Sequence, residues 1–309
     1  MSSDLGVIGA EELRARLPME AAIDALEEAF RTQDAGAGPL RSRVDTAVGT
    51  LLLMPASGRD GVGVKLVTLS PDNPAKGLPF IHAVYALFDA DTQAPTAILD
   101  GAALTALRTA AVSGLATRHL ANPDAGRLAL FGAGVQAASH LEAMRAVRPL
   151  REVVVVSRSR GPAEALVERA RATGLVASLG EPAAVAQADL VCTCTTSATP
   201  VFDGAALGAG VHVNAIGSYQ PHTREVDTET VRRARVVVEH RDVAMAEAGD
   251  LLVAIEEGAI VPEHVVADLA ELVRGTRVRR TPEEITLYEG VGMAFEDLAV
   301  ARAVVDAAR

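Results

Sequence analysis

The apolar positions between residues 11 and 34 recur at helical spacing and form one stripe of leucine, isoleucine and phenylalanine. A helix is predicted there, and Pro18 is expected to break or restart it. Short apolar runs separated by turn-forming clusters follow, as in a series of strands. The predicted strands cover residues 42–48, 50–54, 63–69, 81–89 and 96–99. Several short strands in series predict an antiparallel or mixed sheet.

A different pattern begins beyond a predicted helix over residues 102–120 and a turn-rich sequence at 122–126. Apolar runs now alternate with helix-forming runs, which predicts a parallel sheet with right-handed crossovers. The predicted strands cover residues 127–131, 152–156, 175–178, 190–195, 211–216 and 236–239. Later residues predict helices near 243–255 and 263–272, and one long helix from Ile285 to the C-terminus that returns to the first domain.

Together these patterns predict an α/β protein with two domains. Residues 122–289 are expected to form a Rossmann nucleotide-binding domain. Residues 1–121 and 290–309 are expected to form a second, α+β domain. The chain of 309 residues is long enough for both.

The strongest single motif is a glycine turn between the apolar run at 127–131 and the helix-forming run that follows. Gly132 permits a tight turn, Gly134 lets the backbone approach a pyrophosphate, and Ala137 lets the helix pack closely on its strand. Free N–H groups in the first helical turn would bind the phosphates. Taken alone, the same glycines also fit an ordinary tight turn.

The next apolar run, residues 153–156, ends in Ser157, Arg158, Ser159 and Arg160. This is the place, roughly 20 residues after the glycines, where an NAD site usually has an acidic residue for the ribose hydroxyl. A hydroxyl and two guanidinium groups suit a 2′-phosphate instead. The sequence predicts NADPH, with NADH as the second choice; the alternative is a solvated basic turn.

Composition narrows the class of protein. A net charge of −11 argues against nucleic acid or anionic membrane as a partner. No apolar segment reaches membrane-spanning length, and the first residues do not resemble a signal sequence, so a cytoplasmic protein is expected. Cys192 and Cys194 alternate in a predicted buried strand and are interpreted as reduced core thiols, without a metal site.

Only two of the 29 basic residues are lysines, Lys65 and Lys76. Lysine differs from arginine because burial can lower the pKa of its compact ammonium. Arg41, Lys65 and Arg108 each lie beside a predicted apolar strand or helix, and such cations would bind a carboxylate and hold its α-carbon for hydride transfer. Surface arginines are common, so this pattern has an ordinary explanation too.

Polar residues follow two predicted strands of the parallel sheet, where ligands collect in open α/β folds. Residues 195–200 offer hydroxyl groups beside a dinucleotide, and residues 214–221 follow the strand end where the nicotinamide is expected. The alternative is a pair of capped turns. The expected cofactor contacts are Thr195, Thr196, Ser197, Gly217 and Ser218.

At these positions the sequence resembles the ornithine cyclodeaminase/mu-crystallin family over nearly its whole length. The stretches that carry the resemblance are Pro39-Leu-Arg, Leu53-Met-Pro, Gly63-Val-Lys-Leu-Val-Thr, Leu99-Asp-Gly, Leu104-Thr-Ala-Leu-Arg-Thr-Ala-Ala-Val-Ser, Phe131-Gly-Ala-Gly-Val-Gln-Ala, Asn214-Ala-Ile-Gly and Gly292-Met-Ala-Phe-Glu-Asp-Leu-Ala. The resemblance implies a Rossmann domain, a substrate-binding and dimerisation domain, and homodimers formed by pairing the non-Rossmann sheets.

The resemblance also assigns roles to single residues. Arg41 and Arg108 match the carboxylate-binding arginines of the family, and Lys65 matches its lysine near the substrate carboxylate and reacting nitrogen. Thr109 matches a residue near the cofactor phosphates. The pyrophosphate loop is matched by Gly132, Ala133, Gly134, Val135 and Gln136. Ser157 and Arg158 resemble the members that use NADPH.

One position departs from the cyclodeaminases of the family. They carry an aspartate two residues after the glycine of the Asn-Ala-Ile-Gly strand end, and this chain has Tyr219 there. The departure argues against cyclodeamination of ornithine and favours the mu-crystallin-like ketimine reductases.

The hypothesis from sequence is therefore an NADPH-dependent reduction of a cyclic imino acid, such as Δ1-pyrroline-2-carboxylate or Δ1-piperideine-2-carboxylate, by hydride transfer to C2. Lys65 would donate the proton to nitrogen or hold the carboxylate. The alternatives are an amino-acid dehydrogenase or cyclodeaminase using NAD(P)+, and a non-enzymatic binder of a small molecule.

Overall fold

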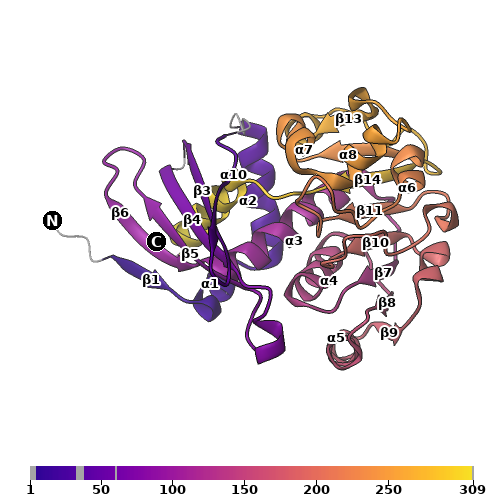
Figure 1. Cartoon of the computed structure of the whole chain (residues 1–309), viewed down its shortest axis with the longest axis horizontal. Helices are drawn as coiled ribbons and strands as arrows, with labels where there is room; N and C mark the ends of the chain where they lie inside the picture. The colour runs from indigo at the N-terminus through magenta and orange to yellow at the C-terminus, as the bar shows by residue number, and fades with distance from the viewer. Residues whose placement is uncertain (1–4, 33–37, 60, 308–309) are drawn as a thin grey trace. The chain divides into compact units, whose positions relative to one another are not determined.

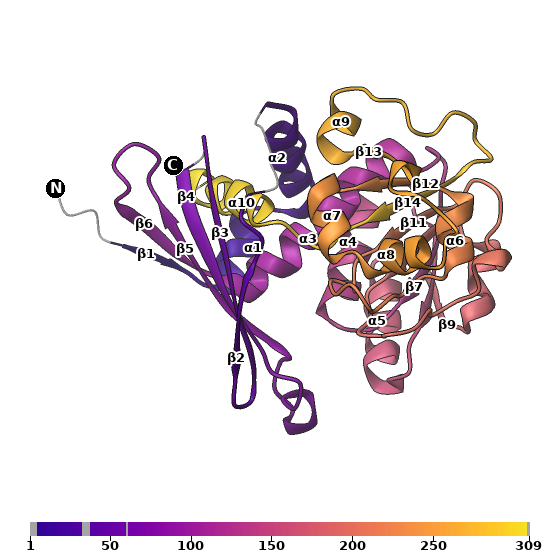
Figure 2. The same cartoon turned by 45° about the horizontal axis from the view of Figure 1, so that its top comes forward.

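The computed structural model describes residues 5–32, 38–59 and 61–307 (Figures 1 and 2). The chain forms two compact units, Met1–Arg108 with Met293–Arg309, and Thr109–Gly292. The first division falls inside helix α3 (Gly101–Leu120), which is one continuous helix, and the second just before α10 (Ala294–Asp306). The sequence patterns place these boundaries at 121/122 and 289/290.

The first unit contains a six-stranded mixed sheet and the helices packed on it. The helical stripe near the N-terminus forms α1 (Ala10–Arg16) and α2 (Met19–Thr32), with the break at Pro18 that the sequence predicts. The sheet order is β1 (Gly6–Ile8), β6 (Pro95–Asp100), β5 (Ile81–Phe88), β4 (Gly61–Leu69), β3 (Gly49–Gly58) and β2 (Ser42–Thr46). Strands β1 and β6 pair in parallel, and the other neighbours pair in antiparallel.

The two faces of this sheet differ in what covers them. Helix α10 packs against β3, β4, β5 and α2, and an edge-on contact between Phe30 and Phe295, with ring centroids 5.2 Å apart, joins the helices. Side chains alternate between the faces along each strand. On β4, Lys65 and Val67 are therefore buried under the helices, whereas Leu66 lies on the other face and is exposed.

The second unit is built on an eight-stranded sheet in which all neighbours are parallel. The order is β13 (Val265–Asp268), β12 (Ala234–Val238), β14 (Ile285–Glu289), β11 (His212–Ala215), β10 (Leu190–Thr193), β7 (Arg127–Phe131), β8 (Glu152–Val156) and β9 (Val176–Leu179). The strand order reverses between β7 and β10, as in a Rossmann fold. The prediction of a Rossmann domain plus an α+β part is confirmed.

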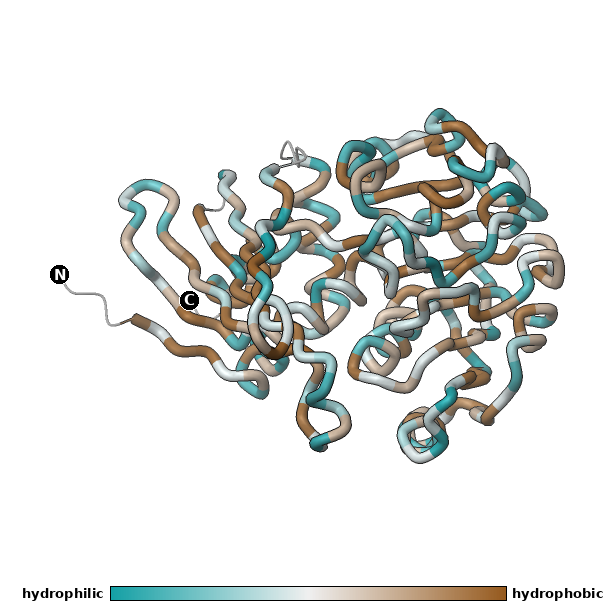
Figure 3. Tube along the Cα trace, viewed as in Figure 1, coloured by the Kyte–Doolittle hydropathy of each residue, from teal (hydrophilic) through white to brown (hydrophobic). Residues whose placement is uncertain are grey.

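Helices connect these strands. They are α4 (Val135–Val147), α5 (Arg160–Ala172), α6 (Thr228–Arg233), α7 (Arg241–Glu247), α8 (Gly249–Glu256) and α9 (Leu269–Val273), with short 3-10 turns η2 (Pro182–Gln187), η3 (Gly204–Ala206) and η4 (Pro262–His264). A further turn, η1 (Pro74–Lys76), belongs to the first unit. Strand segments of the parallel sheet are largely hydrophobic in Figure 3, as expected where helices cover both faces. No helix in the described ranges is both long and apolar enough to cross a membrane.

Two predictions near the C-terminus are wrong. The residues from Ile285 onward do not form one helix: β14 inserts between β11 and β12, and α10 begins only after Gly292, whose φ is +84°. All five residues of β14 are buried, so its sequence lacks the polar alternation that distinguishes a strand. The helix expected at 263–272 is instead η4, β13 and the short helix α9, which starts at a capping box made by Asp268 and Glu271.

Candidate functional site

The glycine turn has the geometry that a dinucleotide loop requires. Gly132 has φ +103°, and a Cβ there would come within 2.4 Å of the Cys194 carbonyl oxygen. Only glycine fits that position. The Gly132 N–H donates to the Val156 carbonyl oxygen at 2.9 Å. The turn therefore brings together the carboxyl ends of β7, β8 and β10, where the strand order reverses.

The start of α4 continues the same surface. Gly134 is its N-cap residue, and no atom lies within 4 Å of a Cβ built there. Val135 is 65% exposed, Ala133 and Gln136 are half-buried, and Ala137 is fully buried against the sheet. A helix of 13 residues with no acidic residue in its first turn offers N–H groups and a positive dipole end to a pyrophosphate. The residues present fit a nicotinamide dinucleotide.

Thr109, which the resemblance placed near the cofactor phosphates, is the first residue of this second unit. It lies in α3 and is half-buried. The boundary between the two units falls between Arg108 and Thr109, which are neighbours in one continuous helix.

The turn after β8 has the polar character that the sequence predicts. Ser157 is half-buried, Arg158 is exposed, and Ser159 is the N-cap residue of α5, with its N–H donating to Ser157 Oγ at 3.2 Å. The Arg160 guanidinium is held by Glu164 at 2.7 Å. Arg158 is therefore the better placed of the two arginines to bind a phosphate.

A buried carboxylate, Glu225, organises the ends of β10 and β11. Its Oε1 accepts from the Thr195 N–H at 2.6 Å and from the Thr195 hydroxyl at 2.5 Å, and its Oε2 accepts from the Gly217 N–H at 2.6 Å. A Cβ on Gly217 would lie 2.5 Å from Glu225 Oε2. We call Glu225 with these two partners the Glu225 clamp.

The polar residues of these loops that were predicted to contact the cofactor differ in their hydrogen bonds and exposure. The Thr195 hydroxyl bonds within the protein, and it also accepts from the Ser197 N–H at 3.1 Å. The Ser218 hydroxyl donates to the Thr223 carbonyl at 2.5 Å, and Thr196 is exposed. Sequence reasoning missed Glu225 because an acidic residue after a strand end usually belongs to a solvated loop.

Three further carboxylates are buried in this unit: Glu239 follows β12, Glu289 ends β14, and Asp250 lies in α8. Asp250 Oδ1 accepts from the N–H groups of Glu225 and Val226 at 2.8 and 2.7 Å. Glu239 accepts from the Tyr288 hydroxyl and from two N–H groups after β14. Burial raises the pKa of Asp250 to about 7 and raises the pKa of Glu289 well above its usual range. Among the described residues, no group of three or more such side chains is arranged to hold a metal ion.

The first unit contains a separate buried cluster of charges. The Lys65 ammonium lies 2.8 Å from Asp297 Oδ1 and 2.7 Å from Oδ2. Arg108 donates to Asp297 Oδ1 through Nε at 3.2 Å and to Glu296 Oε2 through a terminal nitrogen at 2.8 Å. All four side chains are at most 7% exposed. We call Lys65, Arg108, Glu296 and Asp297 the Lys65 cluster.

The environment of Lys65 changes its acidity. Burial lowers the pKa of Lys65 to about 8, with Asp297 opposing this shift and Arg108 and Arg41 adding to it. Arg41 itself is half-buried. The structure thus brings Lys65 and Arg108, two of the three predicted cations, into contact with one carboxylate, Asp297.

The residues that sequence reasoning missed here are the two carboxylates and Tyr85. Glu296 and Asp297 lie in the first turn of α10, within a stretch quoted for the family resemblance but given no role. Two adjacent acids in an apolar helix are the signal that could have found them. Tyr85 pairs with Lys65 across β4 and β5 and is fully buried, and burial raises the pKa of its phenol.

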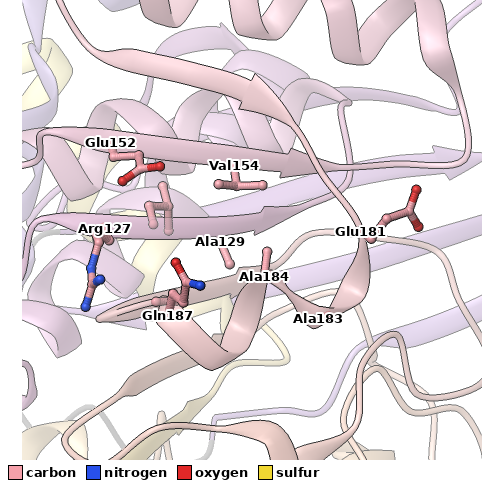
Figure 4. A pocket seen from close by; sticks show the side chains of 10 residues that line it. Arg127, Ala129, Glu152, Val154, Glu181, Ala183, Ala184 and Gln187 are labelled. Atoms are coloured by element: carbon pink, nitrogen blue, oxygen red, sulfur yellow. The ribbon is translucent and has the colours of Figure 1, made fainter.

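A hollow of about 310 Å³ lies elsewhere on the second unit, over β7, β8 and η2 (Figure 4). Its polar lining consists of Arg127, Glu152, Glu181 and Gln187, and the remaining lining residues are mainly alanines. None of the predicted site residues lines it.

Comparison with known proteins finds similarity over nearly the whole chain. A model of the ornithine cyclodeaminase/mu-crystallin family matches residues 6–309. A Delta(1)-pyrroline-2-carboxylate reductase of Bacillus cereus is 36% identical over 278 residues, which cover 85% of this chain and 84% of the relative.

Solved structures agree. Delta(1)-pyrroline-2-carboxylate reductase of Thermococcus litoralis, in complex with NADH and L-proline, has a TM-score of 0.92 at 33% identity and covers 98% of this chain and 97% of its own. An archaeal alanine dehydrogenase dimer with bound NAD has a TM-score of 0.89 at 32% identity, with coverage of 98% and 96%.

The raised pKa of Asp250 has a measurable consequence for stability. Between about pH 4 and pH 7 the folded protein holds this proton and the unfolded chain releases it, so the free energy of unfolding falls as pH rises through that window. Asp250→Asn keeps an oxygen for the two N–H groups but has no proton to lose. In denaturant unfolding, the free energy of unfolding of wild type should fall by about 1–4 kcal/mol relative to that of this variant as pH rises from 4 to 7.

Glu256→Gln, an exposed acid on the same helix, is the matched control and should follow wild type at every pH. A wild-type curve that stays parallel to that of Asp250→Asn would show that this carboxyl ionises normally.

Proposed function

The chain belongs to the ornithine cyclodeaminase/mu-crystallin family, and from this membership and the site geometry we propose that it reduces a cyclic imino acid with NADPH. Membership confirms the resemblance found in the sequence. The substrate is Δ1-pyrroline-2-carboxylate or Δ1-piperideine-2-carboxylate, and the product is the corresponding cyclic amino acid. The Lys65 cluster is the observation that carries the proposal, because it combines permanent and titratable cations in one buried place.

The second unit contains the residues proposed to bind the cofactor. The glycine turn, the start of α4 and the turn after β8 would hold the dinucleotide. When bound, the cofactor supplies the hydride that adds to C2 of the C=N bond. The Glu225 clamp positions the backbone of Thr195 and Gly217 at the strand ends that face such a ligand in a Rossmann fold.

Arg41 and Arg108 bind the substrate carboxylate. Guanidinium groups keep their charge at all relevant pH values and bind carboxylates through two N–H groups. Contacts with Glu296 and Asp297 hold the Arg108 side chain in one orientation, which reduces the entropy lost on binding.

Lys65 supplies the proton. A pKa of about 8 leaves most of the ammonium protonated at pH 7 while making it a better acid than an ordinary lysine. Its proton goes to the imine nitrogen as hydride reaches C2, so the C=N double bond becomes a C–N single bond while a C–H and an N–H bond form. These features support proton donation over simple carboxylate binding.

The choice of NADPH rests on the turn after β8. Ser157, Arg158 and Ser159 occupy the position where an acidic residue would select NAD, and Arg158 is exposed. The structural relatives described above contain NADH or NAD, so the preference is a property proposed for this chain from its own residues.

A homodimer is proposed from the uncovered face of the mixed sheet. Leu66 and Val84 are directly paired on β4 and β5, and they remain 37% and 48% exposed; Val44 on β2 is 48% exposed. An apolar sheet face of this kind marks a protein interface. Pairing with the same face of a second copy would bury it with twofold symmetry.

The assignment is tested first with Lys65→Met. Wild type should oxidise NADPH with both cyclic imino acids, and the variant should lose about 10²–10⁴-fold in kcat/KM because the proton donor is gone. NADPH affinity, measured by fluorescence titration, should change little, since Lys65 belongs to the other unit.

Lys76→Arg is the matched control, because Lys76 is exposed and is the only other lysine. Near-normal reduction by Lys65→Met would remove Lys65 from the mechanism. Faster oxidation of L-ornithine or L-alanine with NAD+ than reduction of either imino acid would replace the proposed reaction.

The cofactor choice is tested with Arg158→Ala. Loss of a charge-assisted contact to the 2′-phosphate should lower the ratio of kcat/KM for NADPH to that for NADH by about 10–100-fold. Arg160→Ala should have a smaller effect, since Glu164 holds that guanidinium. A wild-type enzyme that prefers NADH would contradict the proposal.

The dimer is tested with Leu66→Asp, which places a charge on the uncovered sheet face. Sedimentation at micromolar concentration should show a wild-type dimer and a folded monomeric variant, because burying an unpaired charge in the interface has a large free-energy cost. Val176→Asp serves as the control, since Val176 is 68% exposed in the other unit. A monomeric wild type, or equal dissociation of both variants, would exclude this interface.

A further inference from the structure

Asp297 contacts both buried cations of the Lys65 cluster. Its Oδ1 accepts from Lys65 Nζ at 2.8 Å and from Arg108 Nε at 3.2 Å, and its side chain is completely buried. We infer that Asp297 is a positioning residue: it fixes the Lys65 ammonium in place and keeps it protonated near neutral pH. The inference rests on the imine reduction proposed above, in which Lys65 donates a proton.

The charges of the groups around Lys65 show why the ammonium depends on Asp297. Arg108 from α3 and Arg41 both repel a second positive charge, and burial removes the water that would stabilise it. Tyr85 lies across from Lys65 on β5 as a neutral phenol. Asp297 from α10 is the carboxylate in contact with the ammonium. Without it, each remaining influence favours the neutral amine.

The neighbouring carboxylate has a different task. Glu296 accepts from Arg108 at 2.8 Å and from the Met293 N–H at 3.3 Å, which closes the capping box of α10. Glu296 forms an ion pair with Arg108, whereas the ion pairs of Asp297 include one with Lys65. The two acids are adjacent in sequence and equally buried, so Glu296 provides a matched comparison for Asp297.

The chemical consequence follows from the proton balance. As hydride adds to C2, the electron pair of the C=N π bond takes the Lys65 proton and forms the N–H bond, and Lys65 becomes a neutral amine. Solvent must return that proton before the next turnover. A lysine that is already neutral at working pH cannot make the transfer, so losing Asp297 moves the alkaline limit of activity to lower pH.

The test uses the fact that the chain has only two lysines. Protein labelled with 15N at lysine Nζ gives two side-chain signals, and Lys76→Arg assigns them. The Lys65 signal of wild type should titrate near pH 8. In Asp297→Asn its midpoint should fall by at least about one pH unit, a tenfold change in proton affinity, and in Glu296→Gln by clearly less.

The pH profile of kcat/KM for imine reduction should move with the signal. Its alkaline limb should shift downward in Asp297→Asn by the same amount as the Lys65 midpoint. An unchanged midpoint in Asp297→Asn, or an equal drop in Glu296→Gln, overturns the inference.

A second variant covers the case in which Asp297→Asn does not fold. Arg108→Gln keeps the pair between Asp297 and Lys65 and removes a repelling charge, so the Lys65 midpoint should rise; no rise also overturns the inference. The titration needs no substrate. Shifts as expected, in an enzyme that reduces no imino acid, would therefore refute the proposed function and leave the role of Asp297 intact.

Discussion

Burial of opposite charges in the Lys65 cluster determines how the chain is arranged. Desolvating two cations and two carboxylates costs several kcal/mol for each ion, and only contact between partners offsets that cost. The partners are far apart in sequence: Lys65 and Asp297 are separated by 232 positions, and Arg108 and Glu296 by 188. These contacts hold the C-terminal helix in the first unit, and the second unit, Thr109–Gly292, is an insertion between the two parts of the first.

The second unit also buries charged groups, but it stabilises them differently. Glu225 and Asp250 accept hydrogen bonds from backbone N–H groups rather than from cations. Hydrogen bonds to N–H groups favour the charged carboxylate less strongly than burial disfavours it here, so the pKa values of both acids are raised. The acids of the Lys65 cluster instead meet arginine and lysine directly. The carboxylates of the second unit therefore fix the backbone at strand ends, whereas those of the Lys65 cluster hold charged side chains.

The sequence predicts local features well and distant partnerships poorly. The alternation of apolar runs and helices from residue 127 locates β7, α4 and β8 because each has a strong period and a clear turn. Strand β14 is not predicted, because both of its faces are buried and its sequence does not alternate between apolar and polar residues. Two adjacent acids in an apolar helix mark Glu296 and Asp297 as unusual, but no local pattern shows that Asp297 contacts Lys65, since tertiary packing alone brings them together. Lys65 and Arg108 could be named in advance, but their pairing with these two acids could not.

The cluster gives a physical reason for a lysine, rather than an arginine, at position 65. Arginine at position 65 would keep its proton at any working pH and could only bind. The surroundings of a lysine can adjust its acidity: burial brings the pKa of Lys65 to about 8, with Arg108 and Arg41 adding to the shift and Asp297 opposing it. In the proposed reaction, Arg108 with its permanent charge binds the carboxylate and Lys65 gives up a proton. One of the two lysines of this arginine-rich chain is thus buried where a removable proton is needed, whereas the other, Lys76, is exposed.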